Sequence, residues 1–298
     1  MTIVSELWRY PVKSLGGERL ESVVVEVDGV RGDHVWAVVD RATGHVASAK
    51  RSKLWGELLR CRARLVDDVD LTDPSALEIT LPDGAVLRGD DPRTVAALSE
   101  LTGREVVLRS PAEASRTMEM EWVAESRIGM EAAVETSSAR AEQDAGSDVP
   151  VGAVPTGGAN DRFYDLAHLH VLTTSSLNAL APGSAGSVVR RYRPNVLVGG
   201  PDWDAGWIED AWVDGRVRIG AVEIGVQTPT GRCVMVNLAH QGLPADRGTL
   251  RALAAAHRVP VGYGTADLPS LGVYAEVVTA GAICVGDVVE QVPADALT

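Results

Sequence analysis

Short apolar runs separated by turn residues fill the first ninety positions of the chain. Residues 3–10, 23–27 and 34–40 have the apolar, β-branched character of strands, and Pro11 and Asp28-Gly29 interrupt them with turns. Residues 77–81 and 85–87 flank Pro82-Asp83-Gly84, which has the composition of a hairpin turn. Short strands at this spacing predict an antiparallel barrel or sandwich rather than βαβ units.

Helices are predicted at few places along the chain. Asp91-Pro92 begins an amphipathic stretch that runs to about Thr102, where Gly103 ends it. A second helix is predicted over residues 249–257. Apolar runs at 169–172, 196–198, 217–219 and 222–226 predict further strands, and a last pair of strands surrounds Ala280-Gly281.

The middle of the chain has a different composition. Residues 110–160 are rich in Ala, Glu, Ser and Gly, with a weakly helical centre, and residues 144–161 have the composition of a long loop. We therefore predict a first domain at 1–110, a variable helical and loop connector at 111–160, and a second domain at 161–298. Residues 144–160 are expected to be the most mobile internal segment.

Length and charge narrow the possible functions. The chain has 298 residues, of which 45% are hydrophobic, so it can bury a substantial core without a stabilising disulfide or metal. Its net charge of −13, from 28 basic and 41 acidic residues, argues against a nucleic-acid-binding protein. In so acidic a chain, basic residues beside turns are candidates for contacts to a small anion.

The chain has only three cysteines, Cys61, Cys233 and Cys284, which are too few and too scattered for a disulfide framework. This indicates a reducing compartment. The first residues lack a basic region followed by an apolar core, and no apolar run approaches membrane-spanning length. We expect a cytoplasmic protein that is not inserted in a membrane.

The stretch T-P-T-G-R-C-V-M-V contains the strongest candidate for chemistry, Cys233. Pro229 and Gly231 predict a turn, and residues 234–236 predict a strand directly after the thiol. Arg232 places a cation beside the thiol, which favours the thiolate that attacks or binds soft metals. A buried core cysteine is the alternative interpretation, and the local residues leave both open.

Three other places could bind an anion. Lys13 and Ser14 stand at a predicted turn, and hydroxyl residues at 173–176 separate a strand from a helix, where they could bind phosphate or simply cap the helix. Arginines at 190, 191 and 193 precede a strand. They could form an anion clamp or an exposed basic edge that discourages strand pairing.

Several stretches together resemble one family, the MOSC-domain proteins (the molybdenum cofactor sulfurase C-terminal superfamily) with their N-terminal β-barrel extension. The matching stretches are L-W-R-Y-P-V-K-S, S-A-K-R, V-L-T-T-S-S-L, R-Y-R-P-N, G-R-C-V-M, and L-G-V-Y-A-E-V-V followed by V-G-D. They occur in the expected order over nearly the whole chain. The resemblance implies a mostly β fold with minor α content, in which an N-terminal β-barrel-like domain packs on a β-barrel MOSC domain.

The resemblance also implies a site. Cys233 would bind the molybdenum of a pyranopterin cofactor or carry sulfur as a persulfide, with Arg232 beside it. Lys13 and Ser14 would hold the cofactor's phosphate. The further cofactor contacts implied are Lys50, Arg51, Thr173, Thr174, Ser175, Arg193 and Asn195.

The function implied by the resemblance is a molybdenum oxidoreductase that reduces N-hydroxylated compounds such as amidoximes. The chain has no cysteine cluster for an iron–sulfur centre, so we expect electrons from a separate protein. A persulfide-based sulfur carrier or sulfurtransferase and a non-catalytic cofactor-binding module remain as alternatives, because all three use Cys233. Many relatives carry Asp-Pro-x-Thr-Gly after the cysteine segment, whereas this chain reads N-L-A-H-Q-G-L-P-A-D, which leaves the shape of a substrate pocket open.

Overall fold

A large mixed sheet dominates the computed structural model, which describes residues 1–66, 70–114, 117–121, 151–155, 162–180, 185–200, 206–262 and 267–293. The strand order in this sheet is β19-β14-β15-β17-β12-β13-β1-β2, and β16 pairs with β17 outside this path. Its strands are β1 (Ile3–Arg9), β2 (Glu18–Leu20), β12 (Leu169–Thr173), β13 (Val196–Gly199), β14 (Arg216–Ile219), β15 (Val222–Gly231), β16 (Arg258–Val259), β17 (Leu268–Thr279) and β19 (Val289–Val292). The protein is mostly β with minor α content, as predicted.

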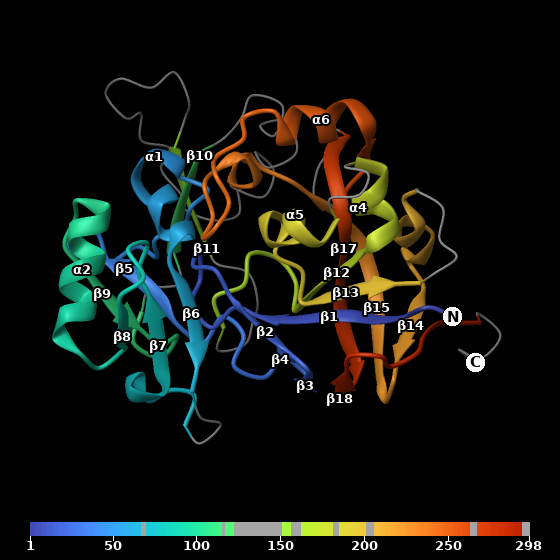
Figure 1. The fold of residues 1–298 in the computed structure, drawn as a ribbon, viewed down its shortest axis with the longest axis horizontal. Coiled ribbons are helices and arrows are strands. Elements are labelled where there is room, and N and C mark those ends of the chain that lie inside the picture. The colour runs from blue at the N-terminus through green and yellow to red at the C-terminus, as the bar shows by residue number, and fades with distance from the viewer. Residues whose placement is uncertain are drawn as a thin grey trace.

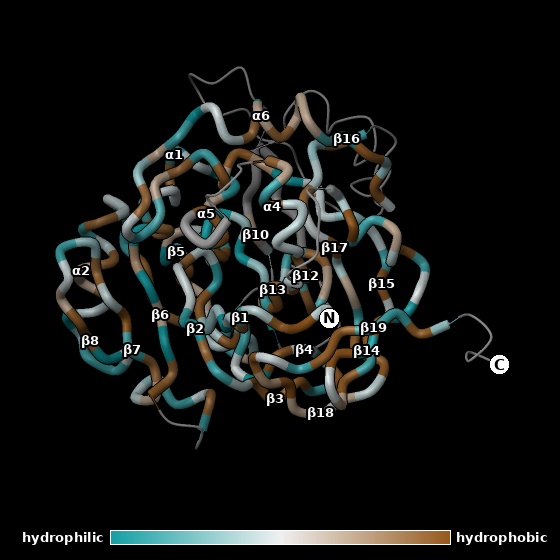
Figure 2. The backbone as a smooth tube through the Cα atoms, turned by 45° about the vertical axis from the view of Figure 1, so that its right-hand side comes forward, coloured by the Kyte–Doolittle hydropathy of each residue, from teal (hydrophilic) through white to brown (hydrophobic). Residues whose placement is uncertain are grey.

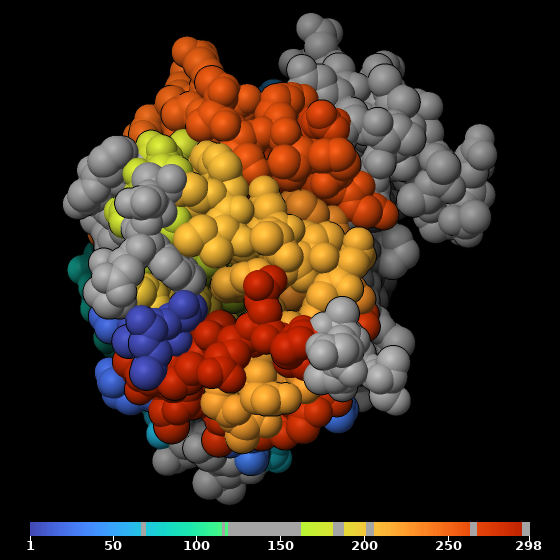
Figure 3. Space-filling model, turned by 90° about the vertical axis from the view of Figure 1, so that its right-hand side faces the viewer, coloured from blue at the N-terminus to red at the C-terminus, as the bar shows by residue number. Residues whose placement is uncertain are grey.

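The first strand of the chain belongs to the sheet of the second half. β1 pairs antiparallel with β13, from Ile3 opposite Gly199 to Leu7 opposite Val196 (Figure 1). The other end of the sheet is tied to the same strand, because the Val289 N–H donates to the Thr2 carbonyl at 2.9 Å. Figure 3 shows the first residues, in dark blue, against the last described strand, in red.

Each face of the large sheet is covered by a different set of elements. One face packs against β3 (Ser22–Glu26), β4 (Gly29–Val30) and β18 (Gly281–Cys284), and its valines and isoleucines form a core with theirs. In Figure 2 these three strands lie together and are largely brown. The other face packs under α4 (Thr174–Leu180), α5 (Ala185–Tyr192) and α6 (Thr249–Ala256), with Leu172, Leu197 and Leu271 beneath them. The sheet is therefore buried on both sides, as its runs of consecutive apolar residues require.

The first hundred residues build a second core beside the sheet. Its strands are β5 (Ala37–Asp40), β6 (Arg62–Leu65), β7 (Leu77–Thr80), β8 (Val86–Arg88) and β9 (Val106–Arg109), and its helical turns are α1 (Ser52–Trp55), η1 (Gly56–Arg60), η2 (Pro74–Ala76) and α2 (Pro92–Thr102). The predicted hairpin is confirmed, because β7 and β8 pair antiparallel. The predicted helix boundaries are confirmed too: Asp91 accepts a hydrogen bond from the Arg93 N–H at 2.9 Å, and Gly103 ends the helix with a φ of 65°.

One strand pair of the large sheet is parallel, outside the part of the chain for which antiparallel strands were predicted. β12 and β13 are parallel, with Val171 opposite Val196 and Thr173 opposite Val198. Parallel neighbours need a crossover of a dozen or more residues. The segment between these strands supplies it as α4 and α5, and so one helical crossover interrupts the β pattern.

The predicted turn and strand around Cys233 are also wrong. β15 continues through Pro229 to Gly231, with shifts in its register against β17 that accommodate the proline. Cys233 begins a short 3₁₀ helix, η5 (Val234–Asn237), and another 3₁₀ helix, η4 (Ile208–Trp212), precedes β14. The apolar run after the thiol does not form a strand. Its Val236 is buried instead by packing beneath α5 and α6.

The expected loop over residues 144–161 is interrupted by a strand. β11 (Val151–Pro155) pairs antiparallel with β10 (Thr117–Glu121). Apart from these strands and residues 111–114, the predicted connector, including its weakly helical centre, lies outside the described residues, and its expected mobility stays a prediction. The proposed division into domains at 110 and 160 stays a prediction. No helix in the described part of the chain is both long and apolar enough to cross a bilayer.

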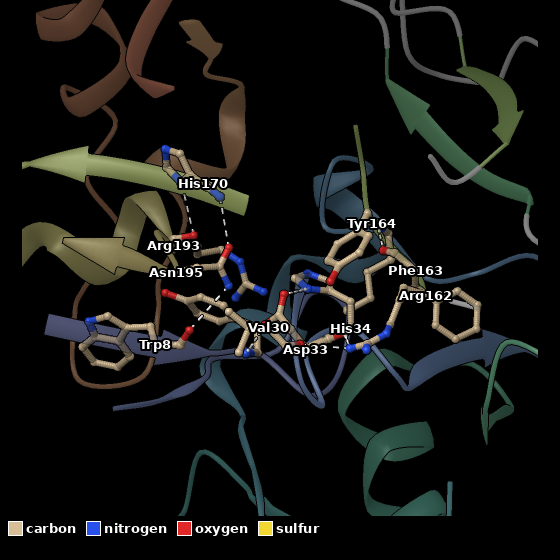
Figure 4. A network of polar contacts seen from close by, with 12 residues as sticks. Trp8, Val30, Asp33, His34, Arg162, Phe163, Tyr164, His170, Arg193 and Asn195 are labelled. Carbon is tan, nitrogen blue, oxygen red and sulfur yellow. Dashed lines mark hydrogen bonds and ion pairs between the residues drawn. The ribbon is translucent and has the colours of Figure 1, made fainter. Parts of the chain in front are cut away.

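Arg162 ties the start of the second half to the hairpin between β3 and β4. Its guanidinium donates to the carbonyls of Val30 and Asp33 at 2.9 and 3.0 Å (Figure 4). It also pairs with Glu26 at 2.9 Å and with Asp28 at 3.2 Å. Only 7% of the side chain is exposed.

We expect Arg162→Met to lower the free energy of unfolding by about 2–3 kcal/mol, because two main-chain carbonyls and two carboxylates lose their charged donor. Denaturant unfolding would measure this loss. Arg64→Met is the matched control: Arg64 pairs with Glu78 at 2.9 Å, but its side chain is 48% exposed, so a change of roughly 0.5 kcal/mol or less is expected. Equal losses in both variants would contradict the role of Arg162.

Candidate functional site

Two lysines from different parts of the first hundred residues share one carboxylate. Lys13 Nζ donates to the Phe163 carbonyl at 2.9 Å and pairs with Oδ1 of Asp165. Lys50 Nζ lies 3.1 Å from the other carboxylate oxygen, Oδ2. The structure thus brings together Lys13, a predicted phosphate contact, and Lys50, a predicted further cofactor contact, and adds an acidic residue that belongs to none of the sequence motifs.

The charges of this cluster depend strongly on one another. Burial alone would raise the pKa of Asp165, but Lys13 and Lys50 together hold the pKa of that carboxyl well below its ordinary value. Burial lowers the pKa of Lys13, and Asp165 only partly opposes this. Burial also disfavours the charged form of Lys50, but Asp165 and then the charge of Cys233 outweigh it, so the pKa of Lys50 is raised. Cys233 is therefore within electrostatic reach of the cluster.

The turn after β1 is held by the loop that carries Lys50. The Ser14 hydroxyl accepts the Ala49 N–H at 3.0 Å and donates to the Ala47 carbonyl at 3.4 Å. Arg51 follows Lys50, and its own N–H donates to the Ser48 carbonyl at 2.9 Å. These bonds fix the distance between the two lysines.

Arg193 reaches the same turn from the other half of the chain. Its guanidinium lies 4.2 Å from the centre of the Tyr10 ring and donates to the Leu15 carbonyl. Burial lowers the pKa of this guanidinium, while Tyr10 and carboxylates that include Asp165 favour its charged form. Arg193 is the one arginine of the predicted clamp that the structure places beside Tyr10 and the turn after β1.

Left-handed backbone gathers around this turn. Among the described residues, four that are not glycine have a positive φ, and Ser14, His34 and Arg193 are three of them, at 65°, 53° and 54°. His34 donates its N–H to the Tyr10 carbonyl at 2.8 Å, and its ring pairs with Asp33 at 2.6 Å. Such conformations cost free energy and often mark functional sites.

Arg232 connects Cys233 to α5. Its N–H donates to the Pro269 carbonyl, and one guanidinium nitrogen donates to the Tyr192 carbonyl, both at 2.7 Å. Within the described part of the chain its Nε is buried without a hydrogen-bond partner, and so is the hydroxyl of Thr230, two residues earlier. Cys233 itself is half-buried. A donor and a hydroxyl without described partners therefore precede a partly accessible thiol.

The segment after Cys233 is fastened to α5 by arginines. Arg191, which is buried, donates to the carbonyls of Val236, Leu238 and Pro244 at 3.3, 3.0 and 2.6 Å, and Arg190 donates to that of Gln241 at 3.0 Å. The prediction of an exposed basic edge is therefore wrong for Arg191, because its side chain is buried. These two arginines bind the loop that follows the thiol.

The predicted hydroxyl residues bond to a different part of the chain. Thr173 donates to Glu209 at 2.6 Å and accepts the Ser176 N–H, as a helix cap does, and Ser175 donates to the Gly206 carbonyl at 2.9 Å. Thr174 lies beside Gly199, at the far end of β13. Their role as cofactor contacts stays a prediction, and the bond from the Ser176 N–H to Thr173 is the one that fits the capping alternative.

Asn195 bonds to the backbone on both sides of β13. Its side-chain oxygen accepts the His170 N–H at 3.1 Å, and its amide donates to the Trp8 carbonyl at 3.4 Å (Figure 4). It therefore holds β12 and β1 in place, immediately beside Arg193. A contact from Asn195 to a cofactor stays a prediction.

The arrangement suits an anionic ligand that also has a soft metal. The positive charge of Lys13, Lys50 and Arg193 together exceeds the negative charge of the Asp165 carboxylate. In addition, Arg232 Nε and the Thr230 hydroxyl have no hydrogen-bond partner among the described residues. In the described residues no group of three or more His, Cys, Asp or Glu side chains could hold a metal ion. The cations and the unpaired donors fit a phosphorylated cofactor, and the assignment of Cys233 as a metal ligand stays a prediction.

Two protein-family models match this chain. Residues 160–290 match the MOSC domain, and residues 1–90 match the MOSC N-terminal beta barrel domain. The chain is a MOSC-domain protein. MOSC domains are associated with molybdenum-cofactor binding and with sulfurase-like proteins, which suggests a molybdenum-related role.

Solved structures similar to this MOSC-domain protein are distant. The YUAD protein from Bacillus subtilis is 10% identical over 97% of this chain and 94% of its own, with a TM-score of 0.40. YiiM from Geobacillus stearothermophilus is 17% identical over 44% of this chain and 57% of its own, with a TM-score of 0.27. No curated protein matches the chain.

The loop after Cys233 of this MOSC-domain protein contains a buried histidine, which makes stability depend on pH. Burial, with the charges of Arg193, Arg191 and Arg190, lowers the pKa of His240 to about 4, although its ring donates to the Met235 carbonyl at 3.1 Å. An unfolded histidine has a pKa of about 6.5, so the unfolded chain takes up a proton before the folded one does as the pH falls.

We therefore expect His240→Gln to reduce the loss of stability between about pH 7 and pH 5 by about 2 kcal/mol. Denaturant unfolding at several pH values would measure the slope. Some of the slope should remain, because burial and Arg232 lower the pKa of His170 to about 3. A variant with the same slope as the wild type would show that His240 titrates alike in both states.

Proposed function

We propose that this protein binds a molybdenum-pyranopterin cofactor and reduces N-hydroxylated compounds, with electrons from a separate protein. The observation that carries the proposal is a half-buried thiol, Cys233, beside unpaired buried donors and within electrostatic reach of a cluster of buried cations. The family match supports the cofactor, and the choice of N-hydroxylated substrates is inferred from the resemblance of the sequence motifs.

Cys233 is the proposed protein ligand to molybdenum. A thiolate is a soft ligand that suits such a metal, and the thiol stands at the start of η5 on a loop that Arg191 holds in place. Arg232 positions the thiol through its bond to the Tyr192 carbonyl and keeps Nε free to donate to the cofactor or the substrate.

The phosphate of the cofactor is proposed to lie at the lysine pair. Lys13 and Lys50 supply charged donors, Ser14 and Arg51 flank them, and Arg193 adds a guanidinium from the other half of the chain. Burial strengthens these interactions relative to a surface site, because little water screens them.

The reaction itself takes two electrons and two protons to convert an N–OH group into N–H and water. The bound cofactor supplies the centre that accepts and passes on these electrons, and the protein sets its position and surroundings. The residues of this chain hold the cofactor at its phosphate, fix the thiol and keep the site partly shielded from water.

Cys233→Ser should abolish amidoxime reduction per folded molecule, because a hydroxyl is a poor substitute for a thiolate on molybdenum. Cys61→Ser and Cys284→Ser are the controls. Cys61 is buried, which raises the pKa of its thiol to about 12, so that variant should lose stability and keep its turnover. Cys284 is exposed, and its replacement should change little. The assay uses an artificial electron donor and protein made in a host that produces the cofactor.

Two outcomes of that experiment favour the alternatives. Sulfur bound to Cys233 as a persulfide, in protein that contains no molybdenum, would support a sulfur carrier or sulfurtransferase. About one molybdenum per chain with no turnover on any N-hydroxylated compound would support a non-catalytic cofactor-binding module. Full turnover by Cys233→Ser would remove the thiol from the mechanism.

Replacing Lys13 and Arg193 together by alanine should deplete bound cofactor while the fold persists. Each charge-assisted hydrogen bond contributes about 1.5–3 kcal/mol, so each loss weakens binding roughly tenfold or more. Molybdenum content per chain measures occupancy, and circular dichroism checks the fold. Arg64→Ala is the control, since its ion pair is on the surface. Normal occupancy in the double variant would overturn the assignment of the phosphate site.

A further inference from the structure

Asp165 lies between the two lysines as a phosphate group would. Each of its carboxylate oxygens pairs with one lysine, Oδ1 with Lys13 and Oδ2 with Lys50. The three side chains are not equally accessible: 4% of Lys13, 19% of Lys50 and 31% of Asp165 are exposed. The acid is thus the member of the cluster that can leave most easily towards solvent.

The backbone on either side of Asp165 is held independently of its carboxylate. The Phe163 N–H donates to the His34 carbonyl, and the Tyr164 hydroxyl donates to the Asp28 carbonyl, both at 2.8 Å. Leu166, the next residue, is exposed, and β12 begins at Leu169. The carboxylate can therefore rotate away from the lysines without unfolding the segment that carries it.

The charges at this place do not balance. Two ammonium groups face the Asp165 carboxylate. Arg193 interacts with Asp165, with Asp33 and with the like charge of Arg232, so the cations still outnumber the carboxylates. An incoming anion with a single charge would only replace what Asp165 already provides. An oxyanion with two charges would add a negative charge where the cluster lacks one, and it would present two or more oxygens to the two lysines.

We propose that Asp165 is a specificity-determining residue, which restricts the Lys13–Lys50 pair to doubly charged oxyanions such as phosphate monoesters and sulfate. Any anion that binds the lysines must displace the Asp165 carboxylate and so loses the free energy of its ion pairs. Only a dianion forms interactions with the lysines that are strong enough to exceed this loss. The inference deepens the proposed function, since it concerns the site assigned to the cofactor's phosphate. It adds to that function a statement of which anions can bind the lysine pair.

Sulfate, inorganic phosphate and acetate test the rule on the full chain, made in a host that lacks the molybdenum cofactor. At constant ionic strength, calorimetry should show that the wild type binds sulfate and phosphate but not acetate. Asp165→Asn should bind acetate, and it should bind sulfate about tenfold tighter or more, because the internal competitor has lost its charge.

Glu18→Gln is the matched control. Glu18 pairs with Arg9 at 2.8 Å and is also mostly buried, but it lies on β2, apart from the lysine pair. Its anion binding should equal that of the wild type. If Asp165→Asn does not fold in the absence of anions, sulfate should restore folding, because it replaces the lost partner of the lysines, and acetate should do the same.

Wild-type protein that binds acetate as well as sulfate, or no anion at all, would overturn the proposal. So would an Asp165→Asn protein with unchanged sulfate affinity, or one that stays unfolded in sulfate. None of these measurements needs molybdenum or turnover. Failure of the proposed function, which is judged by metal content and amidoxime reduction, is therefore distinguishable from failure of this inference.

Discussion

The hydrogen bonds between β1 and β13 decide whether a site exists at all. Because the two strands are antiparallel, the end of β1 lies beside the start of β13. The turn that carries Lys13 and Ser14 follows β1, and Arg193 comes shortly before β13, so pairing brings together groups about 180 positions apart in the chain. Asn195 reinforces this arrangement by bonding to Trp8 on one side and His170 on the other.

A buried excess of positive charge is the electrostatic consequence of that arrangement. Burial disfavours the charged forms of Lys13 and Arg193, and a folded protein keeps them charged only where nearby carboxylates or ring faces compensate. Asp165 and the Tyr10 ring supply part of that compensation. An anionic ligand of the kind proposed above would supply the remainder, and its binding would then stabilise the fold.

The sequence predicts those parts of the structure that depend on local pattern. The hairpin at β7 and β8 and the ends of α2 follow from turn and capping residues, which act over a few positions. The cysteine segment fails for the same reason: Pro229 and Gly231 favour a turn locally, whereas β17 supplies a partner that keeps β15 extended through them. Asp165 stands outside every motif, since nothing near it in the chain shows that two lysines will approach it. Thr173 shows the opposite limit, because one pattern of hydroxyls serves both capping and phosphate binding, and only tertiary contacts distinguish the two uses.

The residues with left-handed backbone around the turn lower the stability of the fold while they supply polar side chains to the site. Glycine would adopt the conformations of Ser14, His34 and Arg193 with less strain, by roughly 1 kcal/mol at each position. A selection for heat resistance alone would therefore favour glycine at these positions. It would discard the hydroxyl, the imidazole and the guanidinium that the strained backbone directs. Greater stability at these three positions would therefore come at the loss of the side chains that surround the turn.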